Sequence, residues 1–330
     1  MTDAEAAPKL PFKHRTVLFK KRWLTAGAVT ILVAGVWIAR EPIADEFIRD
    51  QLESRGVPAR YTIDRIGFRS EILSNIVIGD PQRPDLVAKR VEVLLGYGWR
   101  GPYVSGINAD GVRLYGRFVD GRLSFGSLDK FRDPESKDPF ALPDLSVVLH
   151  DARARVGTPW GDIGAALNGG GNLRRDFTGK LALVAPAIAA VGCRGSDISF
   201  YGSLRVRDVR PQLVGPLRGR ALRCADGRVS AASPQIALDL SLSEDLRSWK
   251  GKADASIVRL VAGPVAAERM GLLAGFDGNS VLTKLDIDAE MGRLRGADFA
   301  ADAVMLEAKG SVGSAAPKFD GRIGFARASG

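Results

Sequence analysis

The sequence predicts a mostly β protein: an N-terminal transmembrane helix followed by a long antiparallel β-sheet with few short helices. An uncharged run of 17 residues, 23–39, directly follows a basic cluster. From Ala59 onward, apolar and polar residues alternate with a period of two, as in strands with one wet and one dry face. The 38 glycines and 17 prolines supply turns between the strands.

The run at 23–39 predicts the transmembrane helix. At about 1.5 Å per residue it reaches about 25 Å, the lower limit for crossing a bilayer. Trp23 and Trp37 fall near its two ends, where amphipathic rings favour the headgroup layer. The predicted anchor residues are Trp23, Leu24, Val29, Ile31, Leu32, Val33, Val36, Trp37 and Ile38.

Charge predicts the orientation of this helix. Five basic residues precede it between Lys13 and Arg22, whereas charges of mixed sign follow it. The positive-inside rule therefore leaves residues 1–22 in the cytoplasm as a basic tail and exports the rest. A cleaved signal peptide is disfavoured, because a cut after Ala39 places Trp37 where a small residue is needed. A buried helix of a soluble protein is disfavoured by the one-sided basic cluster.

The net charge of +9 does not indicate nucleic-acid binding. Six Lys/Arg and two Asp/Glu in residues 1–22 contribute +4, which leaves +5 spread over the remaining 308 residues. No dense basic block follows the membrane segment, so we do not expect a nucleic-acid groove. Membrane lipids are the predicted partners, with other envelope proteins as a second class.

The clearest strands carry strict alternation. Ile236, Leu238, Leu240 and Leu242 alternate with small or polar residues, and Leu285 and Ile287 alternate with charged ones. Leu204 and Val206 form a shorter copy. We predict that these eight residues line one apolar surface. Turn residues separate the strands at 120–121, 169–172, 226–227, 277–279 and 320–321.

Three segments interrupt the alternation. Apolar residues on one face predict a helix within 40–58, next to the membrane. Residues 263–276 (GPVAAERMGLLAGF) are a second helical candidate, with Pro264 suited to a first turn. The proline-rich stretch 132–143 is predicted to be a loop, which divides the exported part into a β sub-block at 59–131 and a longer β region at 144–330.

Cysteine usage leaves two alternatives. Cys193 and Cys224 each lie at the edge of a strand-like run, and in an oxidising exported compartment they are suited to a disulfide. Two free, buried thiols are an equal alternative. Two cysteines without nearby histidines cannot complete a zinc site.

Catalytic signatures are scarce, so we predict neither an enzyme nor a cofactor. His14 lies in the basic tail and His150 ends a strand, where a lone histidine is usually structural. Asp286 and Asp288 share their face with Lys284 and Glu290, which indicates a solvated strand face rather than a metal pair. The glycines at 169–171 lack the Lys-Ser/Thr of a phosphate loop, and no Gly-x-Ser-x-Gly elbow occurs.

Successive motifs in residues 42–131 resemble a known family. EFIRDQLESRGVPARYTI is followed by ILSNIVIGDPQRPDLVAKRVEVLLGYG and then by VSGINADGVRLYGRFVDGRLSFGSLDKF. This succession resembles the start of AsmA-like proteins, most closely the YdbH-like members. The resemblance implies a long, curled antiparallel sheet, anchored in the inner membrane of a Gram-negative bacterium and reaching into the periplasm. It also implies an apolar groove that carries phospholipid acyl chains between the membranes of the envelope.

Length and ending depart from that family. YdbH-like proteins are considerably longer than 330 residues, and the final IGFARASG is typical of a strand interior. We therefore expect a truncated sequence rather than a short relative.

The dry face of one wide sheet has to be covered, either by a second sheet in a closed sandwich or by curling around a ligand. An open face would mark a lipid- or protein-binding surface. Two functions follow as hypotheses. One is a lipid carrier with an open apolar groove. The other is a structural or assembly component of the envelope or of a secretion system, similar to the N subunit of type II secretion.

Topology gives the first testable prediction. If residues 23–39 form an anchor with its N-terminus in the cytoplasm, a reporter that is active only in the periplasm should be active when fused after Gly330. The same reporter fused before residue 23 is the control and should be silent. Reporter activity confined to the cytoplasm at Gly330 would overturn the predicted topology.

Overall fold

The computed structural model describes residues 52–330 except 100, 120–121, 132–141, 191, 225–226, 280, 314–317 and 330. The predicted anchor at 23–39, most of the predicted helix within 40–58 and most of the predicted loop at 132–143 lie outside the described residues. Within the described residues, no helix is long and apolar enough to span a membrane. The anchor and the domain boundaries stay predictions.

Twenty strands and one short helix are found in the described residues, and all the strands belong to a single sheet. The N-terminal elements are β1 (Ala59–Ile66), β2 (Ser70–Asp80), β3 (Arg83–Gly98), β4 (Gly101–Asp110), β5 (Arg113–Val119), β6 (Arg122–Ser124), the 3-10 helix η1 (Gly126–Phe131), β7 (Ser146–Thr158), β8 (Gly161–Asn172) and β9 (Thr178–Ala190). The C-terminal elements are β10 (Cys193–Arg207), β11 (Arg210–Arg218), β12 (Ala221–Cys224), β13 (Val229–Ala232), β14 (Gln235–Leu242), β15 (Ser248–Ala262), β16 (Val265–Asn279), β17 (Leu282–Arg295), β18 (Ala300–Gly313), β19 (Lys318–Gly324) and β20 (Arg327–Ser329).

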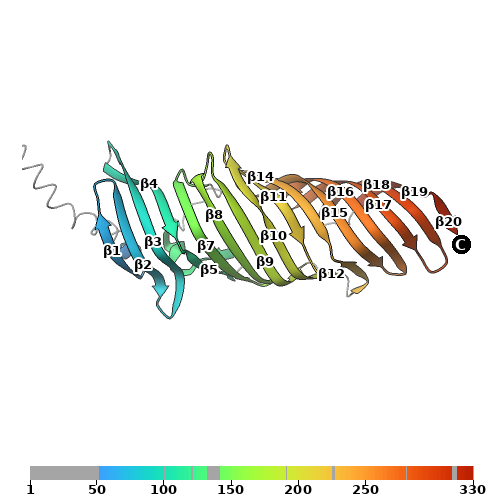
Figure 1. Ribbon diagram of the computed structural model, residues 1–330, viewed down its shortest axis with the longest axis horizontal. Coiled ribbons are helices and arrows are strands. Elements are labelled where there is room, and N and C mark those ends of the chain that lie inside the picture. The colour runs from blue at the N-terminus through green and yellow to red at the C-terminus, as the bar shows by residue number, and fades with distance from the viewer. Residues whose placement is uncertain are drawn as a thin grey trace, which may run out of the picture. The chain divides into compact units, whose positions relative to one another are not determined.

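Strands follow one another across the sheet in chain order, from β1 in blue to β19 in red (Figure 1). Most neighbours are antiparallel pairs joined by hairpins. In three places, two short strands pair end to end with one long neighbour. These are β11 and β12 with β10, β13 and β14 with β15, and β4 and β5 with β7. The predicted mostly β, curled antiparallel sheet is therefore confirmed, with one exception. Strand β7 runs parallel to β4 and β5, because the chain returns through β6 and η1 before β7 begins.

The helix predicted at 263–276 is wrong, because this segment lies in the hairpin of β15 and β16 and in β16 itself. Ala267 and Met270 both pack in one apolar cluster with Leu272 against it. The spacing of three residues between Ala267 and Met270 occurs on a helix face but not in a regular strand. The strand assignment prevails because each residue pairs with β15 or β17 in the unbroken sheet.

Three of the predicted turns are also wrong. The glycines at 169–171 lie within β8, residues 277–279 are the last three of β16, and residues 320–321 lie within β19. Gly169 pairs with Gly179, and a Cβ on Gly169 would come within 2.5 Å of the carbonyl oxygen of Thr178. These glycines therefore allow a close approach of two strands, a second common use of glycine inside a sheet.

Strands β15 to β18 each lose their alternation once, at one row of the sheet. In β15, Ile257 and Leu260 pack against the same cluster, although residues three apart should point to opposite faces. Ala267 and Met270 in β16, and Ala301 and Val304 in β18, show the same loss of alternation, which we call the slip. The register of the strand pairs is the same on both sides of this row.

Backbone conformation explains the slip. On every second strand, one residue of the row has a positive φ: Asp197 (49°), Ser233 (48°), Arg269 (53°) and Ala303 (51°). A residue in this left-handed region turns the chain sharply and places two consecutive residues on the same outer side. Because the turns are aligned across neighbouring strands, the sheet bends along the row. We call this row the bend row.

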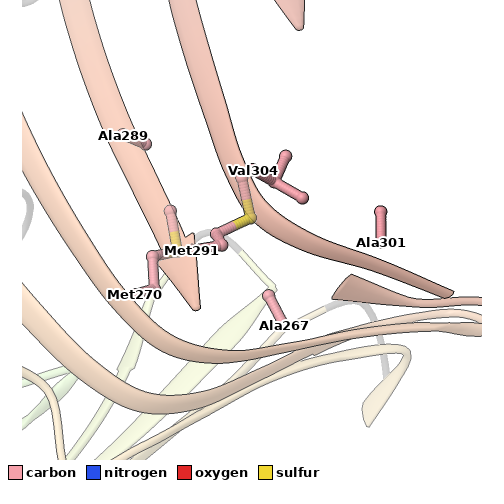
Figure 2. Packing of buried hydrophobic residues seen from close by; sticks show 6 residues of the cluster. All are labelled: Ala267, Met270, Ala289, Met291, Ala301 and Val304. Carbon is pink, nitrogen blue, oxygen red and sulfur yellow. The ribbon is translucent and has the colours of Figure 1, made fainter. Parts of the chain in front are cut away.

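The inner side of the bend holds the main buried cluster. Met270 pairs with Met291, and Met291 pairs with Val304, so the three side chains lie in a line across β16, β17 and β18. Figure 2 shows the strands curving around them. Ala267, Ala289 and Ala301 complete the cluster, and their small size lets the strands approach. Val304 is 1% exposed. Burial of each large side chain stabilises the bend by about 1.5–3 kcal/mol.

At the bend row, glycine and valine substitutions should change the free energy of unfolding in the opposite order from the rest of the sheet. Ala303 has a positive φ and is exposed, so Ala303→Gly should raise the free energy of unfolding by up to about 1 kcal/mol, and Ala303→Val should lower it by about 1–3 kcal/mol. Ala237, exposed in β14 outside the row, is the matched control. There glycine should destabilise by about 0.5–1 kcal/mol and valine should be tolerated. Urea unfolding of the full-length chain in detergent measures all four variants. The same order of stability at both positions would contradict the role of the bend row.

Candidate functional site

One face of the sheet from β9 to β19 is continuously apolar. Residues that pair directly across neighbouring strands share a face, so the registers define it. One row consists of Leu204, Leu213, Leu240, Gly251, Phe276, Leu285, Gly310 and Phe319. The next consists of Leu181, Gly202, Gly215, Leu238, Ala253, Ala274, Ile287, Ala308 and Gly321. The third consists of Leu183, Phe200, Leu217, Ile236, Ala255, Leu272, Ala289, Leu306 and Ile323. We call this surface the apolar face.

Six of the eight residues selected from the sequence lie in these three rows, and Val206 and Leu242 lie one row further along the same face. Leu204 and Val206 come from β10, Ile236, Leu238, Leu240 and Leu242 from β14, and Leu285 and Ile287 from β17. Sequence reasoning missed most of the remaining positions, including Phe276 and Leu272. Phe276 and Leu272 lie in the segment 263–276, which was predicted to be a helix. The period-two pattern on the C-terminal side of Met270 was the available signal for them.

Exposure of the apolar face differs from that of a closed core. Leu238, Leu240 and Ile287 are half-buried, whereas Phe200 and Val206 are buried. Every described strand belongs to the same sheet, so no second sheet among these residues covers the face. A hollow of about 550 Å³ lies on it near β19, lined by Ile287, Leu306, Ala308, Phe319, Gly321, Arg322 and Ile323.

A loop covers the apolar face at β7 and β10. Phe177, at the end of the β8–β9 connection, is 1% exposed and packs with Val147 and Val206. Asn172 fixes this loop by accepting backbone hydrogen bonds from Asp176 and Phe177 (3.1 and 2.9 Å) on its carbonyl oxygen. Val206 therefore belongs to a buried cluster under this loop, whereas Leu240 is half-buried.

The opposite face is polar. Lys309 forms an ion pair with Asp286 (3.0 Å), and this hydrogen bond raises the pKa of the lysine. Beside the bend row, Arg293 donates to Asp302 (2.9 Å) and lowers the pKa of that carboxyl group. The described residues hold no group of three or more side chains suited to a metal. Asp286 and Asp288 lie on this polar face, where Asp286 pairs with Lys309.

A disulfide joins the two cysteines. Cys193 in β10 and Cys224 in β12 are directly opposite in the register, and their sulfur atoms lie 2.04 Å apart. It ties the end of the β9–β10 hairpin to that of the β12–β13 hairpin.

The N-terminal motifs have a structural role. Asp85, in the PDL motif, is buried in β3 and accepts a hydrogen bond from the backbone N–H of Ser127 (2.8 Å). Asp129 accepts from the backbone N–H of Phe125 (3.1 and 3.2 Å). Gly126 has a φ of 64°, and a Cβ there would overlap the Asp85 carboxylate. The PDL motif and the GSLDKF segment of η1 therefore hold η1 against β2 and β3.

A family model described as YdbH-like, "Intermembrane phospholipid transport protein YdbH", matches residues 28–298. The chain belongs to the YdbH-like family. The match extends far beyond residues 42–131, which carried the resemblance in the sequence. No curated protein and no solved structure gives a significant match. The family is one of lipid-transport proteins, with no known enzymatic activity, and suggests a location in the cell envelope.

The disulfide gives a prediction about redox state. Native protein purified in air should contain no thiol that an alkylating reagent modifies. Reduction should lower the free energy of unfolding by about 3 kcal/mol, because the bridge closes a loop with a sequence separation of 31 residues. The Cys193→Ser, Cys224→Ser double variant is the control, since reduction should not change its stability. Two alkylated thiols in the native protein would contradict the bridge.

Proposed function

We propose that this chain carries phospholipid between the envelope membranes, with the acyl chains held on the apolar face. The observation that carries the proposal is the absence of charged side chains from the three rows of that face between β9 and β19, although most of its large side chains are only half-buried. A soluble sheet without a ligand would expose this surface to water at a large cost in free energy.

Backbone groups do not interrupt the apolar face, because neighbouring strands pair their N–H and C=O groups with one another. An acyl chain on the face therefore contacts only apolar atoms. Each methylene removed from water stabilises the complex by about 0.8 kcal/mol. Such contacts are non-directional, so a lipid can move from one strand to the next without breaking a specific bond.

The middle row of the apolar face is suited to the path of a chain. Six of its nine residues between Leu181 and Gly321 are glycine or alanine, and the three large ones are Leu181, Leu238 and Ile287. The two flanking rows carry most of the large residues, including Leu240 and Phe276 on one side and Phe200 and Ile236 on the other. The hollow near β19 lies at one end of this middle row.

The predicted topology supports the same function. An anchor at 23–39 with an exported sheet would place the apolar face in the periplasm of a Gram-negative cell, between the two membranes. The disulfide fits an oxidising compartment. The family match favours a lipid carrier over an assembly component of the envelope or of a secretion system.

The lipid function is tested by one substitution and its neighbour. Leu240→Asp places a carboxylate on the apolar face, where water can still reach it, so the variant should fold but carry less phospholipid. Ser241→Asp, the next residue on the opposite face beside Lys250, should change neither property. Thermal stability and co-purifying phospholipid, determined by mass spectrometry on full-length protein, are measured for each.

Two results would count against this function. If Leu240→Asp unfolds outright, the face is a sealed core rather than a lipid surface. If it folds and carries the normal amount of lipid, the acyl chains do not occupy this face.

A further inference from the structure

Four large aromatic side chains are exposed at one end of the sheet. Phe68 is 61%, Tyr97 50%, Trp99 89% and Tyr103 55% exposed. Phe68 lies in the turn between β1 and β2, and the other three belong to the hairpin of β3 and β4. We call these four residues the aromatic tip.

The aromatic tip is ordered by specific contacts. The rings of Phe68 and Tyr97 stack with their centroids 4.8 Å apart, and the Tyr97 hydroxyl donates a hydrogen bond to the Phe68 carbonyl oxygen (2.5 Å). The backbone N–H of Leu95 donates to the carbonyl oxygen of Arg69 (2.8 Å). The two turns therefore form one surface.

The rings lie on more than one side of the hairpin. Tyr103 pairs with Gly96, and a Cβ on this glycine would come within 2.5 Å of the tyrosine ring. The ring therefore lies across Gly96. Tyr97 pairs with Pro102, so its side chain starts from the other face, and Trp99 lies in the turn. This arrangement is a wedge of rings rather than one side of a packed interface.

The charge of both turns is positive. The segments 67–70 (GFRS) and 96–103 (GYGWRGPY) contain two arginines and no acidic residue. Tyrosine and tryptophan favour the headgroup layer of a bilayer, because their rings are apolar and their O–H or N–H group is polar. Arginine beside them adds attraction to anionic headgroups.

We propose that the aromatic tip docks into the headgroup layer of a phospholipid bilayer. The occupant is a lipid surface, because the wedge combines amphipathic rings with positive charge and lacks the acidic residues that such a surface would repel. The proposal does not depend on lipid transport along the apolar face.

The test places a fluorophore at the tip of the full-length chain. Trp99→Cys is labelled with nitrobenzoxadiazole while the native cysteines remain in their disulfide, and the protein is reconstituted into vesicles of phosphatidylethanolamine and phosphatidylglycerol. The emission should shift to the blue and lose intensity when the vesicles contain brominated phospholipid. The same label at Val258→Cys, a 62% exposed site in β15, should show neither change.

A second variant tests whether the rings drive the docking. Adding Phe68→Ser and Tyr103→Ser to the labelled Trp99→Cys protein should reduce the quenching, while circular dichroism shows an unchanged content of strands. A blue shift without quenching would mean that protein covers the tip, and it would overturn the proposal. Solvent-like emission at position 99, or equal quenching at positions 99 and 258, would also overturn it. Lipid recovery from the same preparations reports separately on the apolar face.

Discussion

The form of the sheet depends on one backbone constraint, a residue with positive φ at the same row of every second strand between β10 and β18. Such a conformation costs about 1–3 kcal/mol for a residue other than glycine, and Asp197, Ser233, Arg269 and Ala303 all adopt it. The cost is offset where the two parts of each strand meet, since Met270, Met291 and Val304 are buried there. Without the slip in alternation, Leu260 and Ala267 would point outward, and the apolar face would end at the bend row.

Most of the apolar face gains no comparable burial. Leu238, Leu240 and Ile287 remain half-buried because the sheet has one layer, and the next strand supplies hydrogen bonds but no covering side chains. Within the part of the chain that the structure describes, the Phe177 loop covers the face at Val206. The fold is therefore stabilised by strand pairing and by the bend. The remaining apolar surface is available to a ligand of the same chemistry, as expected in a family of lipid-transport proteins.

Alternation predicted the sheet and the eight candidate residues, because in β14, and in β17 before the bend row, a single period continues across the apolar face. The same rule failed in β16, because the slip at Arg269 interrupts the period of two between Ala267 and Met270. The bend row requires comparison of positions on strands that pair only in the folded chain. The contact between Asp85 and Ser127 was also beyond sequence reasoning, since 42 residues separate the two partners. The register of Cys193 and Cys224 decided between alternatives that the sequence left equal.

The constant register between β9 and β19 makes each hairpin an equivalent step of a ladder. A hairpin adds two strand spacings, about 9.6 Å, and brings its own positive-φ residue and its own share of the three rows. Loss or duplication of one hairpin would thus change the distance that the apolar face covers without changing its cross-section. The length of such a sheet could therefore be matched to the width of an envelope in steps of one hairpin.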